Sequence, residues 1–232
     1  MPKKIEYVAV GKGEVILFMH GWGQNKEMMI PLIEELKNKY KCVVLDLPGF
    51  GKSDFNNEKN LEEYVSNIRC FLEENNMLPK YVVGHSFGGK LCVEYYLKYK
   101  DISKMFIIAS PILKPKRKLS YYYKIYKYKM LKKIKQKKKV EGGSEDYKHC
   151  PSYMKNFFVN VVNTHYDSRV KDILVPTVLL WGDKDNQVPL NRGEKLNKLI
   201  ENSDLHIVKG SHFAYLENLQ FTKLLLNKFF MR

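Results

Sequence analysis

Apolar and polar positions along this chain follow two alternating periods. Apolar runs of strand length fall at residues 5–10, 15–19, 42–46, 81–84, 105–109, 177–181 and 205–208. Between them, apolar residues recur at helical spacing over residues 27–39, 61–74, 87–99, 190–201 and 215–230. Strands separated by helices pair in parallel, so this order predicts an α/β domain with a mostly parallel sheet and helices on both faces. The tight turn at residues 11–13 predicts that the first two strands form a hairpin.

The alternation stops between residues 111 and 170, which predicts a core of residues 1–110 and 171–232 that is interrupted by an insert. The insert is unevenly charged, because residues 114–139 hold 13 Lys and Arg and no Asp or Glu. The chain carries 40 basic and 25 acidic residues, a formal net charge of +15, so 27 basic residues face 25 acidic ones outside this stretch.

Three interpretations of the basic stretch stay open. It is a solvated lysine-rich helix, a platform for an acidic partner or substrate such as an acyl carrier protein, or a contact for nucleic acid or a membrane surface. Arg117 is the only arginine in the stretch, and no known nucleic-acid-binding fold surrounds it. Nucleic acid is therefore not expected as a partner.

Composition narrows the class of protein. With 232 residues, 44% of them hydrophobic, the chain is long enough for one soluble domain with a substantial core. Its first residues lack the apolar segment of a signal peptide, and no apolar run is long enough to span a bilayer. The four cysteines are scattered without metal-ligand spacing, which indicates neither a disulfide framework nor a zinc site. We therefore expect a cytoplasmic protein without a membrane span.

The most specific chemical signal is the sequence GHSFGG at residues 84–89, between a predicted strand and a predicted helix. A nucleophile elbow needs this order, because a strained strand-to-helix turn exposes the serine hydroxyl and frees the next amide to bind an oxyanion. The glycines at positions 84 and 88 avoid collisions with the neighbouring strand and helix. We predict that Ser86 is a nucleophile. The alternative is a glycine-rich turn whose serine only caps the helix.

A nucleophilic serine needs a general base, and in this architecture the base follows the serine late in the chain. His212 lies in a polar loop after a predicted strand and is the expected base. The other histidines fit less well. His165 lies in the insert, His20 is better explained by loop shaping, and the ring of His85 is expected to point elsewhere.

The base in turn needs an acid that orients it, and two aspartates qualify. Asp183 and Asp185 both follow the end of a predicted buried strand, and their spacing does not separate them. The oxyanion needs two backbone donors. The first is the amide of Phe87, directly after the serine. The second is expected at Trp22, which glycines flank on both sides in the loop after an early strand.

With these motifs in this order, the chain resembles the α/β-hydrolase superfamily from about residue 8 to residue 230. Residues 46–53 (DLPGFGKS) are similar to its Asp-x-Pro-Gly-x-Gly-x-Ser loop. The pattern Gly182-x-x-Asp185-x-x-x-Pro189 resembles the one in which the aspartate three residues after the glycine is catalytic. This resemblance selects Asp185 over Asp183, which becomes a solvated loop position. It also implies that the insert at residues 111–170 is a helical lid over the active site.

Within the superfamily, residues 20–25 (HGWGQN) and 46–51 (DLPGFG) are similar to the pimeloyl-carrier-protein methyl ester carboxylesterases of biotin synthesis. The elbow departs from that subfamily at His85 and Phe87. This difference does not affect the resemblance to the superfamily, but it leaves the identity of the substrate undetermined.

We therefore predict a serine hydrolase that cleaves a carboxylic ester or thioester of a small acyl compound. Ser86, His212 and Asp185 would act through an acyl-enzyme, without a metal or cofactor. The same triad serves carbon–carbon bond hydrolases and lyases, which stay open as alternatives. A non-catalytic binding protein of the same fold is a third alternative, and binding alone would not require all three groups.

Overall fold

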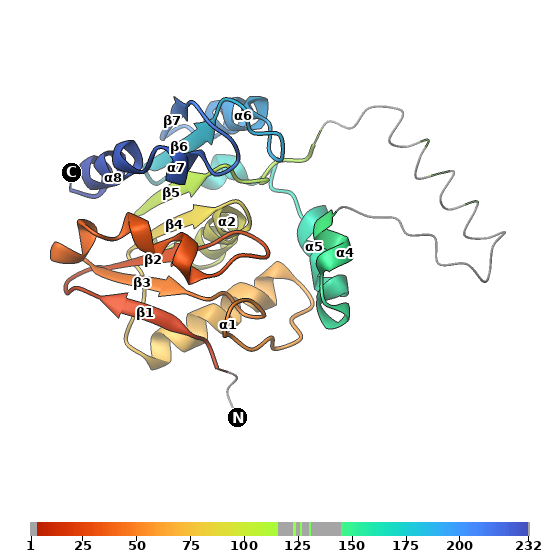
Figure 1. Cartoon of the computed structure of the whole chain (residues 1–232), viewed down its shortest axis with the longest axis horizontal. Coiled ribbons are helices and arrows are strands. Elements are labelled where there is room, and N and C mark those ends of the chain that lie inside the picture. Colours follow the sequence, from red (N-terminus) through yellow and green to blue (C-terminus); the bar gives the residue numbers. More distant parts are fainter. Residues whose placement is uncertain (1–3, 116–122, 124–125, 127–129, 131–144, 232) are drawn as a thin grey trace.

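A computed structural model describes residues 4–115, 123, 126, 130 and 145–231. Its centre is a seven-stranded sheet in the order β1-β3-β2-β4-β5-β6-β7 (Figure 1). Neighbouring strands are parallel except for β1 and β3, which are antiparallel. The predicted mostly parallel sheet is thus confirmed. The strands are β1 (Tyr7–Val10), β2 (Val15–Met19), β3 (Lys41–Leu45), β4 (Tyr81–His85), β5 (Lys104–Ile108), β6 (Thr177–Gly182) and β7 (Ser203–Val208).

The predicted hairpin between the first two strands is wrong. β1 pairs with β3, with Val8 opposite Val44, and β2 lies on the other side of β3. β2 is buried at all five positions, so it takes a parallel partner on each side, whereas β1 is half-exposed, as an edge strand is. Gly11, with a φ of 85°, leads the chain past the start of β3. A side chain there would overlap the carbonyl oxygens of Lys37 and Tyr40.

Side chains of the strands alternate between two cores. One set, which includes Leu17 and Val82, packs with α1 (Leu61–Glu74) and α2 (Phe87–Tyr99). The other, which includes Phe18 and Val83, packs with α7 (Ala214–Glu217), α8 (Leu219–Phe230) and the segment before β3. Helices therefore cover both faces, and α1 and α2 have the predicted bounds. Among the residues described, no helix has both the length and the apolar character that crossing a membrane requires.

The segment before β3 departs from the single helix predicted over residues 27–39. It forms three short 3-10 helices: η1 (Lys26–Met28), η2 (Ile30–Leu32) and η3 (Leu36–Asn38). Pro31 explains the difference, because proline has no N–H to donate and its ring collides with the preceding helical turn. The helix predicted over residues 215–230 is likewise divided, at Asn218, into α7 and α8. The helix predicted over 190–201 is α6 (Leu190–Leu199).

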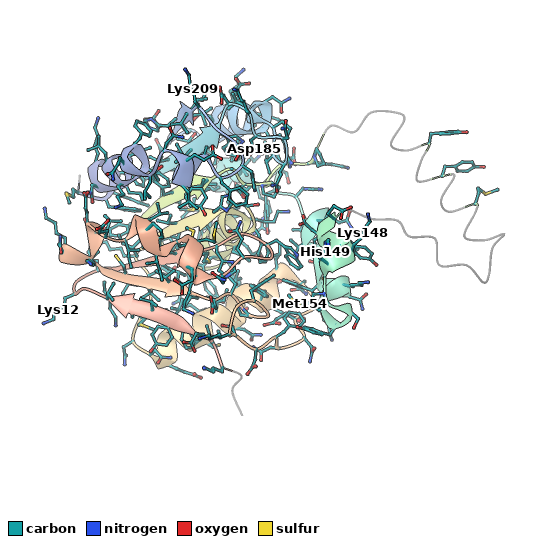
Figure 2. All side chains as sticks on the ribbon, in the orientation of Figure 1. Lys12, Lys148, His149, Met154, Asp185 and Lys209 are labelled. Carbon is teal, nitrogen blue, oxygen red and sulfur yellow. The ribbon has the colours of Figure 1, made fainter. Side chains whose placement is uncertain are left out.

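The described part of the insert contains α4 (Glu145–His149), η4 (Ser152–Met154), α5 (Lys155–Asn163) and, where the core resumes, η5 (Val170–Asp172). Figure 1 shows α4 and α5 on the side of the molecule away from the C-terminus, and Figure 2 labels Met154 there. Phe157 of α5 stacks on Tyr64 of α1, with ring centroids 4.8 Å apart. Apart from residues 114, 115, 123, 126 and 130, the basic stretch at 114–139 lies outside the described residues. The lid and its boundaries stay predictions.

The predicted site residues Trp22, Ser86, Asp185 and His212 lie in loops or turns at the carboxyl ends of strands, and Phe87 begins the helix after Ser86. Trp22 follows β2, Ser86 follows β4, Asp185 follows β6 and His212 follows β7. These four strands are parallel, so their carboxyl ends share one edge of the sheet. The topology therefore brings the four segments to the same edge.

Candidate active site

Ser86 lies on a strained turn between β4 and α2. Its backbone has a φ of 50° and a ψ of −110°, a conformation that residues other than glycine rarely adopt. The amide of Ser86 donates to the carbonyl oxygen of Ile108 at 2.8 Å, which ties the turn to β5. A side chain at Gly84 would overlap the backbone of Gly88, and one at Gly88 would overlap the carbonyl group of Met19 in β2. Only glycine at these two positions permits the close approach of strand and helix.

His212 and Asp185 form a buried pair. Nδ1 of His212 lies 2.7 Å from Oδ2 of Asp185 (Asp185 is labelled in Figure 2), and the residues are 4% and 5% exposed. The other carboxylate oxygen, Oδ1, accepts hydrogen bonds from the amides of Gln187 and Val188, both at 2.8 Å. An ionised carboxylate can only accept, so Nδ1 of His212 donates. Nε2 then holds the lone pair that a general base uses.

Asp183 has different contacts from Asp185. It is exposed, and its Oδ1 accepts a hydrogen bond from the amide of Gly210 at 2.9 Å. Its own amide donates to the carbonyl oxygen of Val208, also at 2.9 Å. Asp183 therefore anchors the loop that carries His212, whereas Asp185 contacts the ring itself.

The amides of Trp22 and Phe87 have no hydrogen-bond acceptor within the described part of the chain. Phe87 is the first residue of α2, where amides lack an intrahelical partner and the helix dipole favours negative charge. Trp22 follows Gly21, whose amide donates to Oε1 of Gln24 at 2.9 Å and so shapes the loop. The side chains of Trp22 and Phe87 line the same cavity as Ser86. Both amides are free to bind an oxyanion.

His20 shapes its loop, as its position in the sequence suggests. The amide of Leu47 donates to its Nε2 at 3.0 Å, so Nδ1 carries the hydrogen and donates to the carbonyl oxygen of Gly21 at 2.7 Å. Burial lowers the pKa of His20 to about 4, which keeps the ring neutral. The loop after β3 is held further by a buried ion pair between Asp46 and Lys26, at 2.9 Å.

His85 has a role that the sequence did not reveal. Its ring centroid lies 4.7 Å from that of His212. Its Nε2 lies 3.0 Å from the carbonyl oxygen of His212, and because a carbonyl only accepts, Nε2 donates. Burial, with a smaller contribution from His212, lowers the pKa of His85 to about 3. A neutral His85 therefore holds the backbone of His212 in place.

A cavity of about 200 Å³ is lined by Ser86 together with residues from α2, α5 and α6. Its apolar wall includes Trp22, Phe158 and Val161. The rings of Trp22 and Phe158 pack edge to face, with centroids 4.8 Å apart. Helix α5 of the insert therefore forms one side of the cavity.

Lys90 lines the same cavity and is only 1% exposed. Its Nζ donates to the carbonyl oxygens of Val161 and Thr164 at 2.8 and 2.9 Å, which ties α2 to the end of α5. Burial, with a smaller contribution from Arg192, lowers the pKa of Lys90 to about 7. A lysine in the same cavity as Ser86 is thus poised to change its charge near neutral pH.

Arg192 of α6 and His165 of the insert complete the polar side of the cavity. Nη2 of Arg192 donates to the carbonyl oxygen of Leu113. Nε of Arg192 and Nδ1 of His165 are buried without a hydrogen-bond partner in the described part of the chain. Burial, with smaller contributions from Lys90 and Arg192, lowers the pKa of His165 to about 4, so its ring is neutral.

These three polar residues were not predicted from the sequence. One signal was present for Lys90, since it lies four residues after Ser86 and so on the same side of the predicted helix. No local pattern marks His165 or Arg192, because their meeting depends on how the insert and α6 pack.

A family model described as alpha/beta hydrolase fold matches residues 14–130 and 113–219. One curated relative is a 2-hydroxy-6-oxononadienedioate/2-hydroxy-6-oxononatrienedioate hydrolase from Comamonas testosteroni. It is 23% identical, over 90% of this chain and 84% of the relative. A thermophilic esterase from Thermogutta terrifontis superposes with a TM-score of 0.77 at 16% identity, over 99% of this chain and 93% of the esterase. A meta-cleavage product hydrolase from Pseudomonas fluorescens gives 0.76 at 19% identity, over 98% and 94%. At these identities the superpositions establish the fold alone.

Proposed function

Because this chain belongs to the alpha/beta hydrolase fold family and is a hydrolase, we propose that it cleaves a carboxylic ester or thioester through Ser86, His212 and Asp185. The observation that carries the proposal is the buried contact of 2.7 Å between His212 Nδ1 and Asp185 Oδ2. It occurs at the sheet edge where Ser86 lines a cavity from a strained turn. Acyl transfer requires these three elements: a nucleophile, a base and a group that orients the base.

In the proposed reaction, Oγ of Ser86 attacks the acyl carbon while Nε2 of His212 accepts the hydroxyl proton. The tetrahedral oxyanion accepts hydrogen bonds from the amides of Trp22 and Phe87. His212 then protonates the leaving alcohol or thiol, and Ser86 remains acylated. A water molecule gives a proton to His212 and attacks the acyl carbon, after which the proton returns to Ser86 as the acid departs. Asp185 stabilises the charged imidazole in both halves of the cycle.

Hydrolysis of a carbon–carbon bond is the second candidate, and the relatives favour it. Two from Comamonas testosteroni, 23% and 24% identical to this chain, are named as hydrolases of 2-hydroxy-6-oxo acids. The same serine, histidine and aspartate would serve that reaction. The two candidates differ in the bond that breaks, so a substrate panel separates them.

The test uses the full chain with p-nitrophenyl butyrate, a butyryl thioester and 2-hydroxy-6-oxo-6-phenylhexa-2,4-dienoate. We expect turnover of the ester or thioester, and Ser86→Ala should lower kcat by roughly 10⁴ or more. Ser168→Ala, a matched change at an exposed serine, should have no effect. A fluorophosphonate probe should label the wild-type protein and not Ser86→Ala. Turnover of the dienoate alone would transfer the proposal to the second candidate, and turnover that survives Ser86→Ala would refute both.

A further inference from the structure

The cavity at Ser86 contains two cationic side chains. Lys90 and Arg192 both line it, and neither forms an ion pair with a carboxylate among the described residues. An ammonium group has three N–H donors and a guanidinium has five. Lys90 uses two of its donors on backbone carbonyls, and Arg192 uses one on Leu113. Several donors therefore remain for a ligand.

Asp146 of α4 also lines the cavity, but it does not neutralise this charge. It is exposed and makes no ion pair with Lys90 or Arg192. His165 adds a ring that is neutral near pH 7 and can donate through one nitrogen. Asp167 and Asp185 also act on Arg192, but these carboxylates are paired with Lys195 and His212. Within the described part of the chain, the cationic groups of the cavity therefore have no carboxylate paired with them.

Leaving such groups unpaired is costly. Buried charges in proteins are normally paired, and a buried donor without a partner calls for an explanation. Nε of Arg192 is such a donor within the described part of the chain, and Nδ1 of His165 is a second buried polar atom without a partner there. The pKa of Lys90, which burial and Arg192 lower to about 7, fits this picture, because Lys90 has no paired carboxylate among the described residues. A bound anion would supply a partner at all three residues.

We propose that this cavity is an anion subsite of the active site, in which Lys90, Arg192 and His165 bind a carboxylate carried by the acyl group of the substrate. This inference rests on the proposed function, because it deepens the assignment of the same cavity. Recognition of the carboxylate would draw on the guanidinium N–H groups that Arg192 does not use on Leu113 and on the remaining N–H of Lys90. The apolar wall of Trp22 and Phe158 would contact the methylene groups between the carboxylate and the scissile carbonyl.

The cavity of about 200 Å³ presents an apolar wall and a cationic side to the same ligand. A succinyl group is a simple acyl group with both matching parts, since methylene groups separate its carboxylate from the scissile carbonyl. The substrate class is therefore a half-ester or half-thioester of a dicarboxylic acid.

The first experiment compares kcat/KM for monomethyl succinate and methyl succinamate, which differ only in carrying a carboxylate or a neutral amide of similar size. Charge-assisted hydrogen bonds predict a preference of about ten- to a hundredfold for the succinate. Acetylglycolate carries its carboxylate on the leaving alcohol and should show no such preference over its amide. A preference confined to acetylglycolate would overturn the assignment to the acyl group. Equal kcat/KM values for every acid and amide would overturn the subsite.

The second experiment tests the residues. Arg192→Gln should reduce the succinate-to-succinamate ratio at least tenfold, and Arg192→Lys should retain part of it because the charge remains. Arg169→Gln removes an arginine that is exposed and is not among the residues that line the cavity, and it should leave the ratio unchanged. A ratio that falls equally in Arg169→Gln would mean that net charge alone steers the substrate. If Arg192→Gln does not fold, Arg192→Lys decides the outcome.

A binding measurement separates failure of this inference from failure of the proposed function. Calorimetric titration of the Ser86→Ala protein should show tighter binding of monomethyl succinate than of methyl succinamate, by at least tenfold. The difference should disappear when Arg192→Gln is added. Selective binding in a protein that turns over no ester would uphold the subsite and refute the esterase proposal. Equal binding of the two ligands, with ester turnover that depends on Ser86, would do the reverse.

Discussion

The exchange of Asp185 for asparagine tests whether His212 depends on Asp185, because it replaces only the carboxylate oxygen that contacts the His212 ring. The asparagine side chain would still offer one oxygen to the amides of Gln187 and Val188, as Oδ1 of the aspartate does. Its NH₂ group would then face Nδ1 of His212, where Oδ2 of Asp185 now lies at 2.7 Å. Two donors cannot pair, so the ring would take the tautomer with its proton on Nε2. His212 would have no lone pair to accept the proton of Ser86.

The expected loss is large. In a serine protease triad the equivalent Asp-to-Asn change lowers kcat by about 10⁴. At 1.36 kcal/mol for each factor of ten, this loss equals about 5.4 kcal/mol of transition-state stabilisation. Asp183→Asn is the matched control, since Asp183 is exposed and its contact with the amide of Gly210 survives in an asparagine oxygen. We expect kcat of Asp183→Asn to stay within about a factor of two, because exposed substitutions change free energies by about 0.5 kcal/mol or less.

The measurement is kcat with p-nitrophenyl butyrate for the wild-type protein and both variants, at one pH and with enzyme in excess where turnover is slow. Thermal unfolding midpoints of the same samples separate a catalytic loss from unfolding, which matters because Asp185 is buried. A greater loss in Asp183→Asn would transfer the role to that residue. Small and equal losses in both variants would refute the reasoning that His212 depends on an acid.

Three further predictions follow from other parts of the molecule. Gly88→Ala should lower the free energy of unfolding by about 1–3 kcal/mol in urea titrations, because its methyl group would overlap the carbonyl group of Met19; an unchanged midpoint would contradict the close packing of α2 on β2. The preference for monomethyl succinate should be greatest below pH 7 and fall as the pH rises, because Lys90 is charged below its pKa of about 7 and neutral above it. Over the same range His165 stays neutral and Arg192 stays charged. If the succinate-to-succinamate ratio of kcat/KM is flat from pH 6 to 8.5, Lys90 has no role in this preference. The last prediction concerns the replacement of four lysines of the basic stretch with glutamine: Lys132, Lys133, Lys137 and Lys138. If residues 114–139 dock an acidic acyl carrier, this change should raise KM for an acyl-carrier substrate in a salt-sensitive manner and leave kcat/KM for a small neutral ester unchanged. Equal losses of kcat/KM on both substrates would indicate a structural role for these lysines.

Local patterns were enough for the features that neighbouring residues decide. The strand-length runs and helical spacings predict the parallel sheet, and the bounds of α1 and α2 match the spacing. The strained turn at Ser86 could be predicted from the sequence, because the glycines that permit it lie within a few residues of the serine. The choice between Asp183 and Asp185 needed more than spacing, and it came from resemblance to a family pattern.

Tertiary structure decided what depends on distant residues. The hairpin prediction for β1 failed because β2 is buried between two parallel neighbours, a condition set by the whole sheet. His85 contacts His212 across 127 residues of sequence, and no short motif encodes that contact. The same holds for Lys90, His165 and Arg192, which meet only because α2, the insert and α6 enclose one cavity. Periodicity reports which face of an element is apolar, but the identity of the side chains that share a cavity depends on how those faces pack together.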